Sequence, residues 1–361
     1  MTKHRRGREW GLPFAGEPGP FNAITDVPGV QVGLTTIREP DVATGVTAVL
    51  PIGRQHPLRP VWAGMCRFNG NGEMTGTHWI KDAGYFLGPL MITNTHSVGM
   101  VHHATLAWMI RQYPAQFDSP RHLWAMPVVA ETYDGALSDI NGLHVREEHV
   151  WHALDSAAGG VVAEGGVGGG TGMIAYGFKG GTGTSSRQVT AGGRAGVVAA
   201  LVQANHGARS SLTILGVPVG EVWDEDGTPP ERGSLIVYIG TDLPLLPHQL
   251  DRVARRAAVG MARTGAFGGH HSGDLFLAFS VANPIPLPHD QPSVLALEAL
   301  SDEHLDPVYV AAVQAVEEAI INAMLAGEPM VTRRPPGHVI PALDGGRLVS
   351  IMRAYGRMQD G

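Results

Sequence analysis

Short apolar segments separated by Gly- and Pro-rich turns dominate the chain, and they predict a protein rich in β-strands. The predicted strands are residues 31–37, 46–51, 91–95, 122–130, 212–217, 235–240 and 275–280. Several of these segments are apolar at successive positions, which is typical of strands covered on both faces of a sheet. We therefore expect sheets that are buried beneath other elements.

A helical period appears in four other segments, residues 101–113, 147–157, 247–264 and 305–325. In the third segment Leu250, Val253 and Ala257 fall on one face of the helix. The fourth begins with Asp306 as the expected N-cap and Pro307 in the first turn. Because strands outnumber helices and do not alternate strictly with them, the pattern predicts a layered α+β domain.

Glycines gather in clusters between residues 159 and 196, and short apolar segments separate the clusters. We expect buried strands at residues 161–163, 173–176 and 197–202, with glycines where two backbones approach closely. Residues 224–233 form an acidic, Pro/Gly-rich stretch that predicts a surface loop. A domain linker is the alternative, but the apolar strand that follows directly would have to be buried.

Composition limits the classes of protein that fit. The chain has 361 residues, of which 43% are hydrophobic and 16% charged, so it can bury a sizeable core as one large domain or two ordinary ones. The 26 Lys and Arg against 33 Asp and Glu give a net charge of −7, which offers no basic surplus for nucleic acid or an anionic membrane.

Targeting and redox signals are weak. The basic start is not followed by an apolar stretch, and no apolar run approaches the roughly 20 residues of a membrane span, so we expect no signal peptide, no membrane partner and a cytoplasmic location. The single cysteine, Cys66, cannot form an internal disulfide. It is either a nucleophile or, more commonly for a lone cysteine, a small buried hydrophobic residue.

Familiar catalytic motifs do not fit. The glycines at 166 and 168 are followed by Thr171 where a dinucleotide fingerprint needs glycine, and no acidic residue follows at the expected strand end. A phosphate-binding loop and a Gly-x-Ser-x-Gly elbow are also missing from the sequence. The histidine pairs at 102–103 and 270–271 point to different faces in a helix or a strand, so the sequence predicts no metal site.

One junction carries distinctive chemistry. Ser234 stands at the first position of an apolar strand, directly after Gly233 and at the end of the exposed loop. An ordinary polar strand start is one interpretation. The other is self-cleavage before Ser234: its hydroxyl attacks the preceding carbonyl and the new α-amine, with an ordinary pKa of about 7.7–8.0, then serves as general base.

Other residues fit that second interpretation. Asn205 is a side-chain amide after an apolar run, and it can donate to an oxyanion. Ser272 and Asp274 are two positions apart before a predicted strand, where they can orient a nucleophile and relay protons. Glu131 and Tyr133 are likewise two apart after a strand. Ordinary turn chemistry remains the alternative for both pairs.

The sequence also resembles a known family. It contains Phe68-Asn-Gly-Asn-Gly-Glu-Met-Thr-Gly76, Ala130-Glu-Thr-Tyr-Asp-Gly135 and Phe178-Lys-Gly-Gly-Thr-Gly-Thr-Ser-Ser-Arg187. Further matching stretches are residues 18–29, 93–99, 168–171, 202–205, 216–220, 232–234 and 246–250. From about residue 18 to the C-terminal region, the chain is similar to the L-aminopeptidase/D-esterase (DmpA-like) family, which includes the β-peptidyl aminopeptidases.

The resemblance implies a fold and a processing event. The family fold is an αββα four-layer sandwich, shared with ornithine acetyltransferase, so a single catalytic domain is expected over residues 1–361, with residues 1–17 as a flexible N-terminal arm. Cleavage between Gly233 and Ser234 would give chains 1–233 and 234–361 that stay associated. The resemblance implies no metal or organic cofactor. It does imply a homo-oligomer, namely a tetramer of the two-chain unit.

The resemblance also implies roles for the candidate residues. Ser234 matches the nucleophile, Asn205 the oxyanion-hole asparagine, and Ser272 and Asp274 the residues that assist the nucleophile. Some members have Glu at the position of Asp274, so the contact of the shorter side chain is open. Tyr133 matches a tyrosine of the pocket, and Glu131 a carboxylate that holds the free ammonium of the substrate.

The expected activity is therefore that of a self-processing serine aminopeptidase or amidase acting on short peptides, aminoacyl amides or esters. Three alternatives stay open. One is a related amide hydrolase of the pantetheine- or nylon-oligomer-hydrolase kind, in which the nucleophile is threonine. Another is an acyltransferase of the ornithine acetyltransferase type. The third is a non-catalytic binding protein on the same fold.

Overall fold

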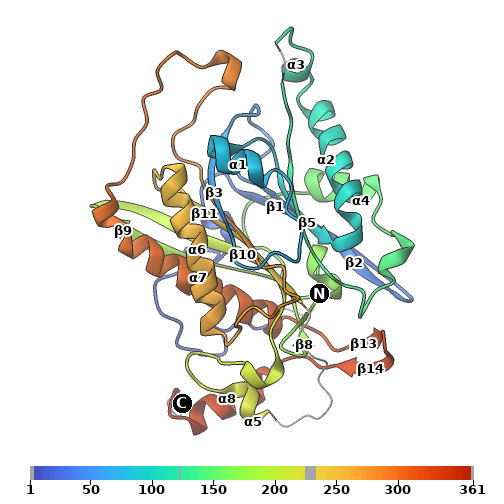
Figure 1. Ribbon diagram of the computed structural model, residues 1–361. Coiled ribbons are helices and arrows are strands. Elements are labelled where there is room, and N and C mark those ends of the chain that lie inside the picture. Colours follow the sequence, from blue (N-terminus) through green and yellow to red (C-terminus); the bar gives the residue numbers. More distant parts are fainter. Residues whose placement is uncertain (1–3, 122, 224–232, 359–361) are drawn as a thin grey trace.

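The computed structural model describes residues 4–121, 123–223 and 233–358, and it contains two main β-sheets (Figure 1). The first has the strand order β1 (Gln31–Glu39), β2 (Val42–Leu50), β5 (Leu90–Asn94) and β6 (Val128–Thr132). The second has the order β4 (Tyr85–Phe86), β3 (Val61–Arg67), β12 (Leu275–Ser280), β11 (Ser234–Thr241), β10 (Arg194–Asn205) and β9 (Gly181–Ala191).

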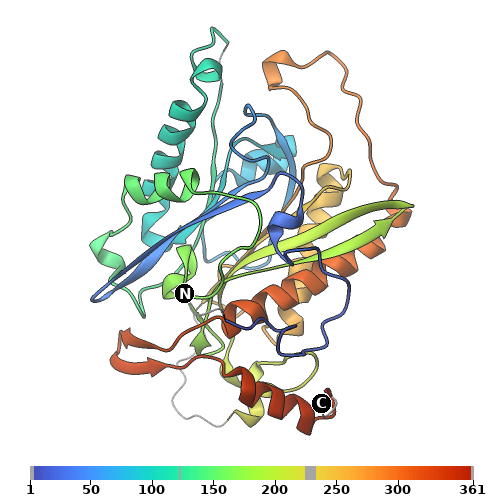
Figure 2. The same ribbon diagram turned by 180° about the vertical axis from the view of Figure 1, so that it is seen from behind.

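Helices cover the outer face of each sheet. In both views the sheets lie between α2 (Val98–Gln112) and α4 (Glu147–Asp155) on one side and α6 (Pro247–Arg263) and α7 (Asp306–Leu325) on the other (Figures 1 and 2). Three apolar clusters fill the three interfaces between these four layers. The predicted αββα sandwich is thereby confirmed.

Strand β11 shows why a doubly apolar segment becomes a central strand. Successive side chains of a strand point to opposite faces. Leu235 and Val237 pack under the helices α6 and α7, whereas Ile236 and Tyr238 pack between the two sheets. Every residue of β11 is buried, as the sequence predicted.

Smaller elements complete the fold. They are α1 (Thr77–Ala83), α3 (Pro114–Phe117), α5 (Val219–Val222), α8 (Gly345–Ala354) and the hairpins β7 (Ile174–Ala175)–β8 (Phe178–Lys179) and β13 (Met330–Arg333)–β14 (Pro336–Ile340). Helix α7 is long and apolar enough for a membrane span by length and composition alone. Most of it is buried against β9 and β10, as in the core helix of a globular domain.

Several expected elements differ from the structure. Residues 212–217 form no strand, because Leu215 and Gly216 both have positive φ and turn the chain, although Leu212 and Ile214 are buried. Residues 161–163 also form no strand, and Val161 is 84% exposed. Of residues 122–130, only the end lies in β6, and residue 122 is outside the described residues.

Two further expectations concern helix and loop ends. Asp306 is the first residue of α7, and Leu305 occupies the N-cap position. Most of the predicted surface loop, residues 224–232, lies outside the described residues. The predicted helices at 101–113, 147–157, 247–264 and 305–325 are confirmed with small shifts of their ends.

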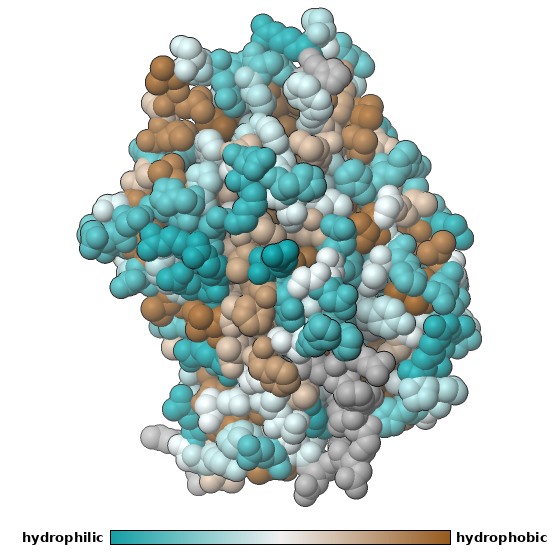
Figure 3. Space-filling view, in the orientation of Figure 1, coloured by the Kyte–Doolittle hydropathy of each residue, from teal (hydrophilic) through white to brown (hydrophobic). Residues whose placement is uncertain are grey.

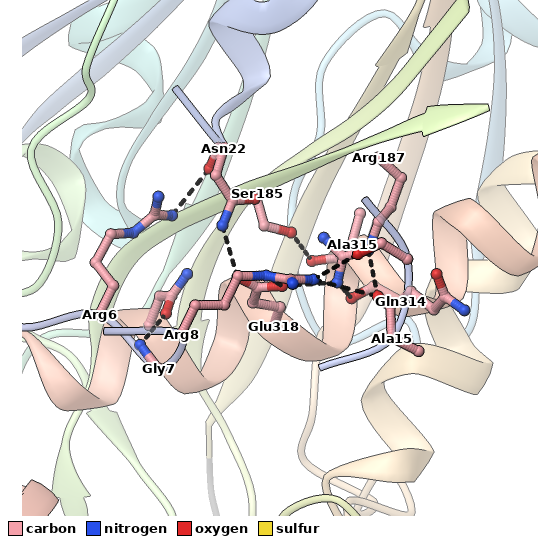
Figure 4. A network of polar contacts seen from close by, with 12 residues as sticks. Arg6, Gly7, Arg8, Ala15, Asn22, Ser185, Arg187, Gln314, Ala315 and Glu318 are labelled. Atoms are coloured by element: carbon pink, nitrogen blue, oxygen red, sulfur yellow. Dashed lines mark hydrogen bonds and ion pairs between the residues drawn. The ribbon is translucent and has the colours of Figure 1, made fainter. Parts of the chain in front are cut away.

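The expectation of a flexible arm over residues 1–17 is wrong for residues 4–17. Leu12 and Phe14 are buried in the cluster beneath α7. The guanidinium of Arg8 pairs with the buried carboxylate of Glu318, which also holds Arg187 at 2.7 Å (Figure 4). Apolar burial and this charge network tie the N-terminal segment to the domain.

Candidate active site

Strand direction brings the predicted site residues to one edge of the six-stranded sheet. β11 and β12 run parallel, so Ser234 at the start of β11 and Asp274 just before β12 share that edge. β10 runs antiparallel to β11 and ends there with Asn205. Parallel strands begin at the same edge of a sheet, and an antiparallel neighbour ends at that edge. Segments that are distant in the sequence therefore supply one site.

Gly233 and Ser234 lie tightly against β10. Ser234 is the register partner of Asn205 and is 7% exposed. A Cβ at position 233 would lie 1.7 Å from the carbonyl oxygen of Asn205. Only glycine fits there, which is a steric reason for Gly233 beyond the ease of attack on its carbonyl.

The segment that leads into β12 contacts the Ser234 hydroxyl and the backbone next to it. The backbone N–H of Gly273 donates to Ser234 Oγ at 2.9 Å. Asp274 Oδ1 accepts from the backbone N–H of Leu235 at 2.9 Å, so the aspartate fixes the main chain next to Ser234. Ser272 Oγ is buried and has no hydrogen-bond partner among the described residues, which is costly unless a ligand or a reacting group supplies one.

The amide of Asn205 has one possible orientation. The backbone N–H of Ile174 can only donate and lies 2.9 Å from Oδ1, whereas the carbonyl of Tyr133 can only accept and lies 3.1 Å from Nδ2. These two contacts place Nδ2 on the side of Tyr133. The –NH₂ group has two hydrogens, and the Tyr133 carbonyl uses one of them.

Glu131 lies in β6 and is 3% exposed. Its carboxylate accepts from the backbone N–H of Glu73 at 2.8 Å and from the hydroxyl of Thr95. Burial raises the pKa of Glu131, and these hydrogen bonds oppose that rise.

Gly72 lies between the carboxylate of Glu131 and the backbone next to the nucleophile. A Cβ at position 72 would lie 3.2 Å from both Glu131 Oε1 and Gly273 Cα. The carboxylate is therefore close to the backbone that holds Ser234 Oγ. The absence of a side chain at position 72 lets these groups approach each other.

Tyr133 follows the end of β6 and is 45% exposed. Its ring folds back over Gly135, where a Cβ would lie 2.2 Å from Tyr133 Oη. Tyr133, Asn205 and Gly233 line a cavity of about 470 Å³, whereas Glu131 is not among its lining residues. Of the predicted pair, Tyr133 lines this cavity and Glu131 does not.

Sequence reasoning missed the other residues around this cavity. They include His206, Thr332, Arg334 and His338, and the last three come from the β13–β14 region. Burial lowers the pKa of His206 to about 3, so this histidine is neutral and acts as an aromatic wall against Tyr176. Its place directly after Asn205 was the one signal in the sequence that could have identified it.

Two alternatives to a serine nucleophile gain no support from the described residues. Cys66 is half-buried on β3, and burial raises the pKa of its thiol, which disfavours the reactive thiolate. Across the described ranges, no group of three or more His, Cys, Asp or Glu side chains is arranged to hold a metal ion.

Comparison with known proteins matches the whole site region. The profile of peptidase family S58 matches residues 22–336. The chain is 45% identical to beta-peptidyl aminopeptidase BapA of Sphingosinicella microcystinivorans, covering 98% of this chain and 93% of that protein.

Two solved structures are also similar. The L-aminopeptidase D-Ala-esterase/amidase of Ochrobactrum anthropi, described as a prototype for the serine aminopeptidases and a variant of the Ntn hydrolase fold, has a TM-score of 0.95 and 55% identity over 98% of this chain and all of that one. A beta-aminopeptidase of a Burkholderia species has a TM-score of 0.89 and 45% identity over the same shares.

Proposed function

The chain belongs to peptidase family S58 and is a hydrolase of the aminopeptidase class, and from this premise we propose that its nucleophile is Ser234 Oγ, made active by cleavage of the Gly233–Ser234 bond. The observation that carries this assignment is the position of Ser234 Oγ, which accepts from Gly273 N–H opposite Asn205 at one sheet edge. The same edge opens to a cavity lined by Gly233 and Asn205.

Self-cleavage would proceed as an acyl shift. Ser234 Oγ attacks the carbonyl carbon of Gly233, the C–N bond breaks, and an ester forms between the Gly233 acyl group and Ser234. Water then hydrolyses the ester, leaving a carboxylate on Gly233 and a free α-amine on Ser234. That amine can accept the proton of its own hydroxyl in later turnovers, so the reaction requires no catalytic histidine.

Peptide cleavage would use the same atoms. Ser234 Oγ attacks the scissile carbonyl, the α-amine takes its proton and passes it to the departing amine, and water resolves the acyl-enzyme. The second Nδ2 hydrogen of Asn205 is the candidate donor to the oxyanion. Ser272 Oγ, buried beside the Gly273 amide, is the candidate partner of the Ser234 hydroxyl or amine.

Glu131 supports a preference for substrates with a free amino terminus. A buried carboxylate is stabilised by a cation, so an ammonium group binds there and a blocked amine leaves the charge unpaired. We propose short peptides, aminoacyl amides and aminoacyl esters as the substrate class.

The deciding experiment compares the wild-type chain with Ser234→Ala and, as a matched control, Ser156→Ala at the exposed end of α4. Denaturing electrophoresis and N-terminal sequencing should show two wild-type fragments, the smaller beginning at residue 234, and one uncut, inactive Ser234→Ala chain. The control should be cut and active. Cleavage at another bond, or normal activity of uncut Ser234→Ala, would contradict the assignment.

A competing outcome is acyl transfer on the same scaffold. Adding an amine acceptor to the reaction and measuring the acylated amine against the free acid separates hydrolysis from transfer. The family assignment favours hydrolysis.

We also propose a homo-oligomer of the two-chain unit. Trp79, Tyr85 and Trp124 line an apolar surface pocket, and Trp124 is 64% exposed. Hydrophobic side chains also gather at the upper left of the face shown in Figure 3. Surfaces of this kind are typical of interfaces between copies. Light scattering after gel filtration, with Trp124→Ser as the variant, tests the assembly.

A further inference from the structure

Lys179 is a fully buried basic side chain close to the site, and no step proposed above uses it. It lies in β8, is 0% exposed, and its Nζ donates to three backbone carbonyls. The acceptors are Met173 O at 2.9 Å, Gly180 O at 2.8 Å and Gly170 O at 3.3 Å. Three acceptors match the three N–H bonds of a protonated lysine.

One of these acceptors belongs to a peptide group that also contacts Asn205. The Met173 carbonyl accepts from Lys179 Nζ and from the backbone N–H of Gly180, both at 2.9 Å. The N–H on the other side of the same peptide bond, that of Ile174, donates to Asn205 Oδ1 at 2.9 Å. In a trans peptide the C=O and N–H point in opposite directions, so this peptide group joins Lys179 to Asn205.

We propose that Lys179 is a positioning residue for the oxyanion donor: it fixes and polarises the Met173–Ile174 peptide, whose N–H holds Asn205 Oδ1 and so directs Nδ2 toward the reacting carbonyl. This inference rests on the proposed role of Asn205. It assigns Lys179 a function in the reaction, exerted through one peptide group, in addition to its hydrogen bonds to the carbonyls of Gly170 and Gly180.

Physical chemistry supports action through this peptide group. A cation at a carbonyl oxygen draws electron density from the amide and makes its N–H a stronger donor, by about 10–30% per bond in such chains. Burial lowers the pKa of Lys179 to about 7, with Arg38 acting in the same direction and Glu328 against it. The carbonyl dipoles around Nζ favour the charged form.

The test is a double-mutant cycle between Lys179→Met and Asn205→Ala, with Arg209→Met as the matched control. Arg209 is also a buried cation held by backbone carbonyls, Tyr176 O at 2.6 Å and Gly177 O at 2.7 Å. These carbonyls belong to other peptide groups than the Met173–Ile174 peptide whose N–H holds Asn205 Oδ1. Values of kcat and KM are measured on an aminoacyl p-nitroanilide, per cleaved chain, with the melting temperature of each variant.

We expect Asn205→Ala to lower kcat roughly 10²–10³-fold, as for loss of one oxyanion donor. Lys179→Met should lower kcat at least about tenfold with KM changed less than about threefold, because the oxyanion forms only in the transition state. In the Asn205→Ala background it should have almost no further effect on kcat. The effects of Arg209→Met and Asn205→Ala should multiply.

The outcomes separate the inference from the site assignment. If Asn205→Ala leaves kcat unchanged, the assignment of the oxyanion donor fails. If it lowers kcat but the Lys179→Met effect multiplies with it, or falls on KM alone, only the inference fails. Lys179→Gln, which keeps two N–H donors, replaces Lys179→Met if that variant does not fold. If neither folds while Arg209→Met does, Lys179 serves folding and the inference is overturned.

Discussion

Asn205 and Ser234 are register partners, the last residue of β10 facing the first residue of β11. A cut before Ser234 would free an amine at this edge without unpairing β11, since β10 and β12 hold that strand on both sides. Residues 234–361 supply the central strands β11 and β12, while residues 1–233 supply the flanking strands. The two fragments would therefore stay associated, because separating them breaks the sheet at its centre.

Glu131→Gln tests the ammonium site through pH. Burial raises the pKa of Glu131 above its ordinary 4.5, so the anion that binds an ammonium forms only as the pH rises above that value. For a substrate with a free amine, 1/KM should increase with pH through this window. The variant should lose this dependence and show a KM raised about 10–100-fold at pH 8, since hydrogen bonds to charged groups are worth about 1.5–3 kcal/mol.

The control for Glu131→Gln is Glu39→Gln at the exposed end of β1. Its KM profile should follow that of the wild-type chain. An N-acetylated substrate provides the second comparison, because it has no ammonium to bind. If the ratio of the KM values for the free and the acetylated substrate is the same in the wild-type chain and in Glu131→Gln, this carboxylate does not bind the ammonium.

The sequence predicted the layers well because burial on two faces leaves a strong local signal. The segment at 235–240 is apolar throughout, and it forms the central strand β11. The segment at 212–217 is also mostly apolar but turns at Leu215 and Gly216, so its burial comes from packing without strand pairing. A run of apolar residues reports burial, while backbone turns decide whether a strand forms.

The site was predicted only in part, for a related reason. Ser234 and Asn205 were identified because Ser234 stands directly before an apolar run and Asn205 stands at the end of one. Arg334 and His338 reach the cavity through the β13–β14 hairpin, whose backbone N–H groups at 333 and 334 donate to Ala136 O. That contact spans about half the chain, and no local pattern reports it.

Arg334→Gln tests a preference of the cavity for substrates with an anionic group. The cavity is lined by the side chains of Arg334 and His338 and by no Asp or Glu side chain among the described residues, so these side chains favour an anionic group. KM for a dipeptide with a free C-terminal carboxylate should rise about threefold, the scale of an exposed ion pair, while KM for the matching dipeptide amide stays unchanged.

Arg333→Gln is the neighbouring control, because Arg333 pairs with Asp139 at 3.1 Å and does not line the cavity. Its KM values for the two substrates should move together. If Arg334→Gln also changes the KM values for the two substrates equally, the guanidinium does not bind the terminal carboxylate.

Asp134→Asn tests the cost of a buried carboxyl next to the site. Burial raises the pKa of Asp134 to about 7 from 3.8. Between these two pH values the carboxyl is protonated in the folded chain and ionised in the unfolded chain. The unfolded state then binds fewer protons, and the free energy of unfolding falls as pH rises from about 4 to about 7, by roughly 4 kcal/mol at most.

Melting temperatures at pH 5 and pH 8 measure this effect. The wild-type chain should lose more stability between the two values than Asp134→Asn, and the variant should be the more stable at pH 8. Asp118→Asn, at an exposed position, should behave as the wild-type chain does. Parallel losses in all three chains would show that Asp134 does not carry the pH dependence.

Ser272→Ala separates a catalytic hydroxyl from a structural one. Ser272 Oγ is buried without a hydrogen-bond partner among the described residues, so its removal takes away an unsatisfied polar atom and should leave the melting temperature unchanged or higher. If Oγ assists Ser234 in the reaction, kcat should still fall, by roughly 10²-fold for loss of a proton-relay group.

Asp274→Ala is the contrasting variant, because Asp274 Oδ1 holds Leu235 N–H and its loss leaves a buried donor unpaired, which costs about 1–3 kcal/mol. A Ser272→Ala chain that loses stability while keeping kcat would place the hydroxyl in the fold and exclude it from catalysis.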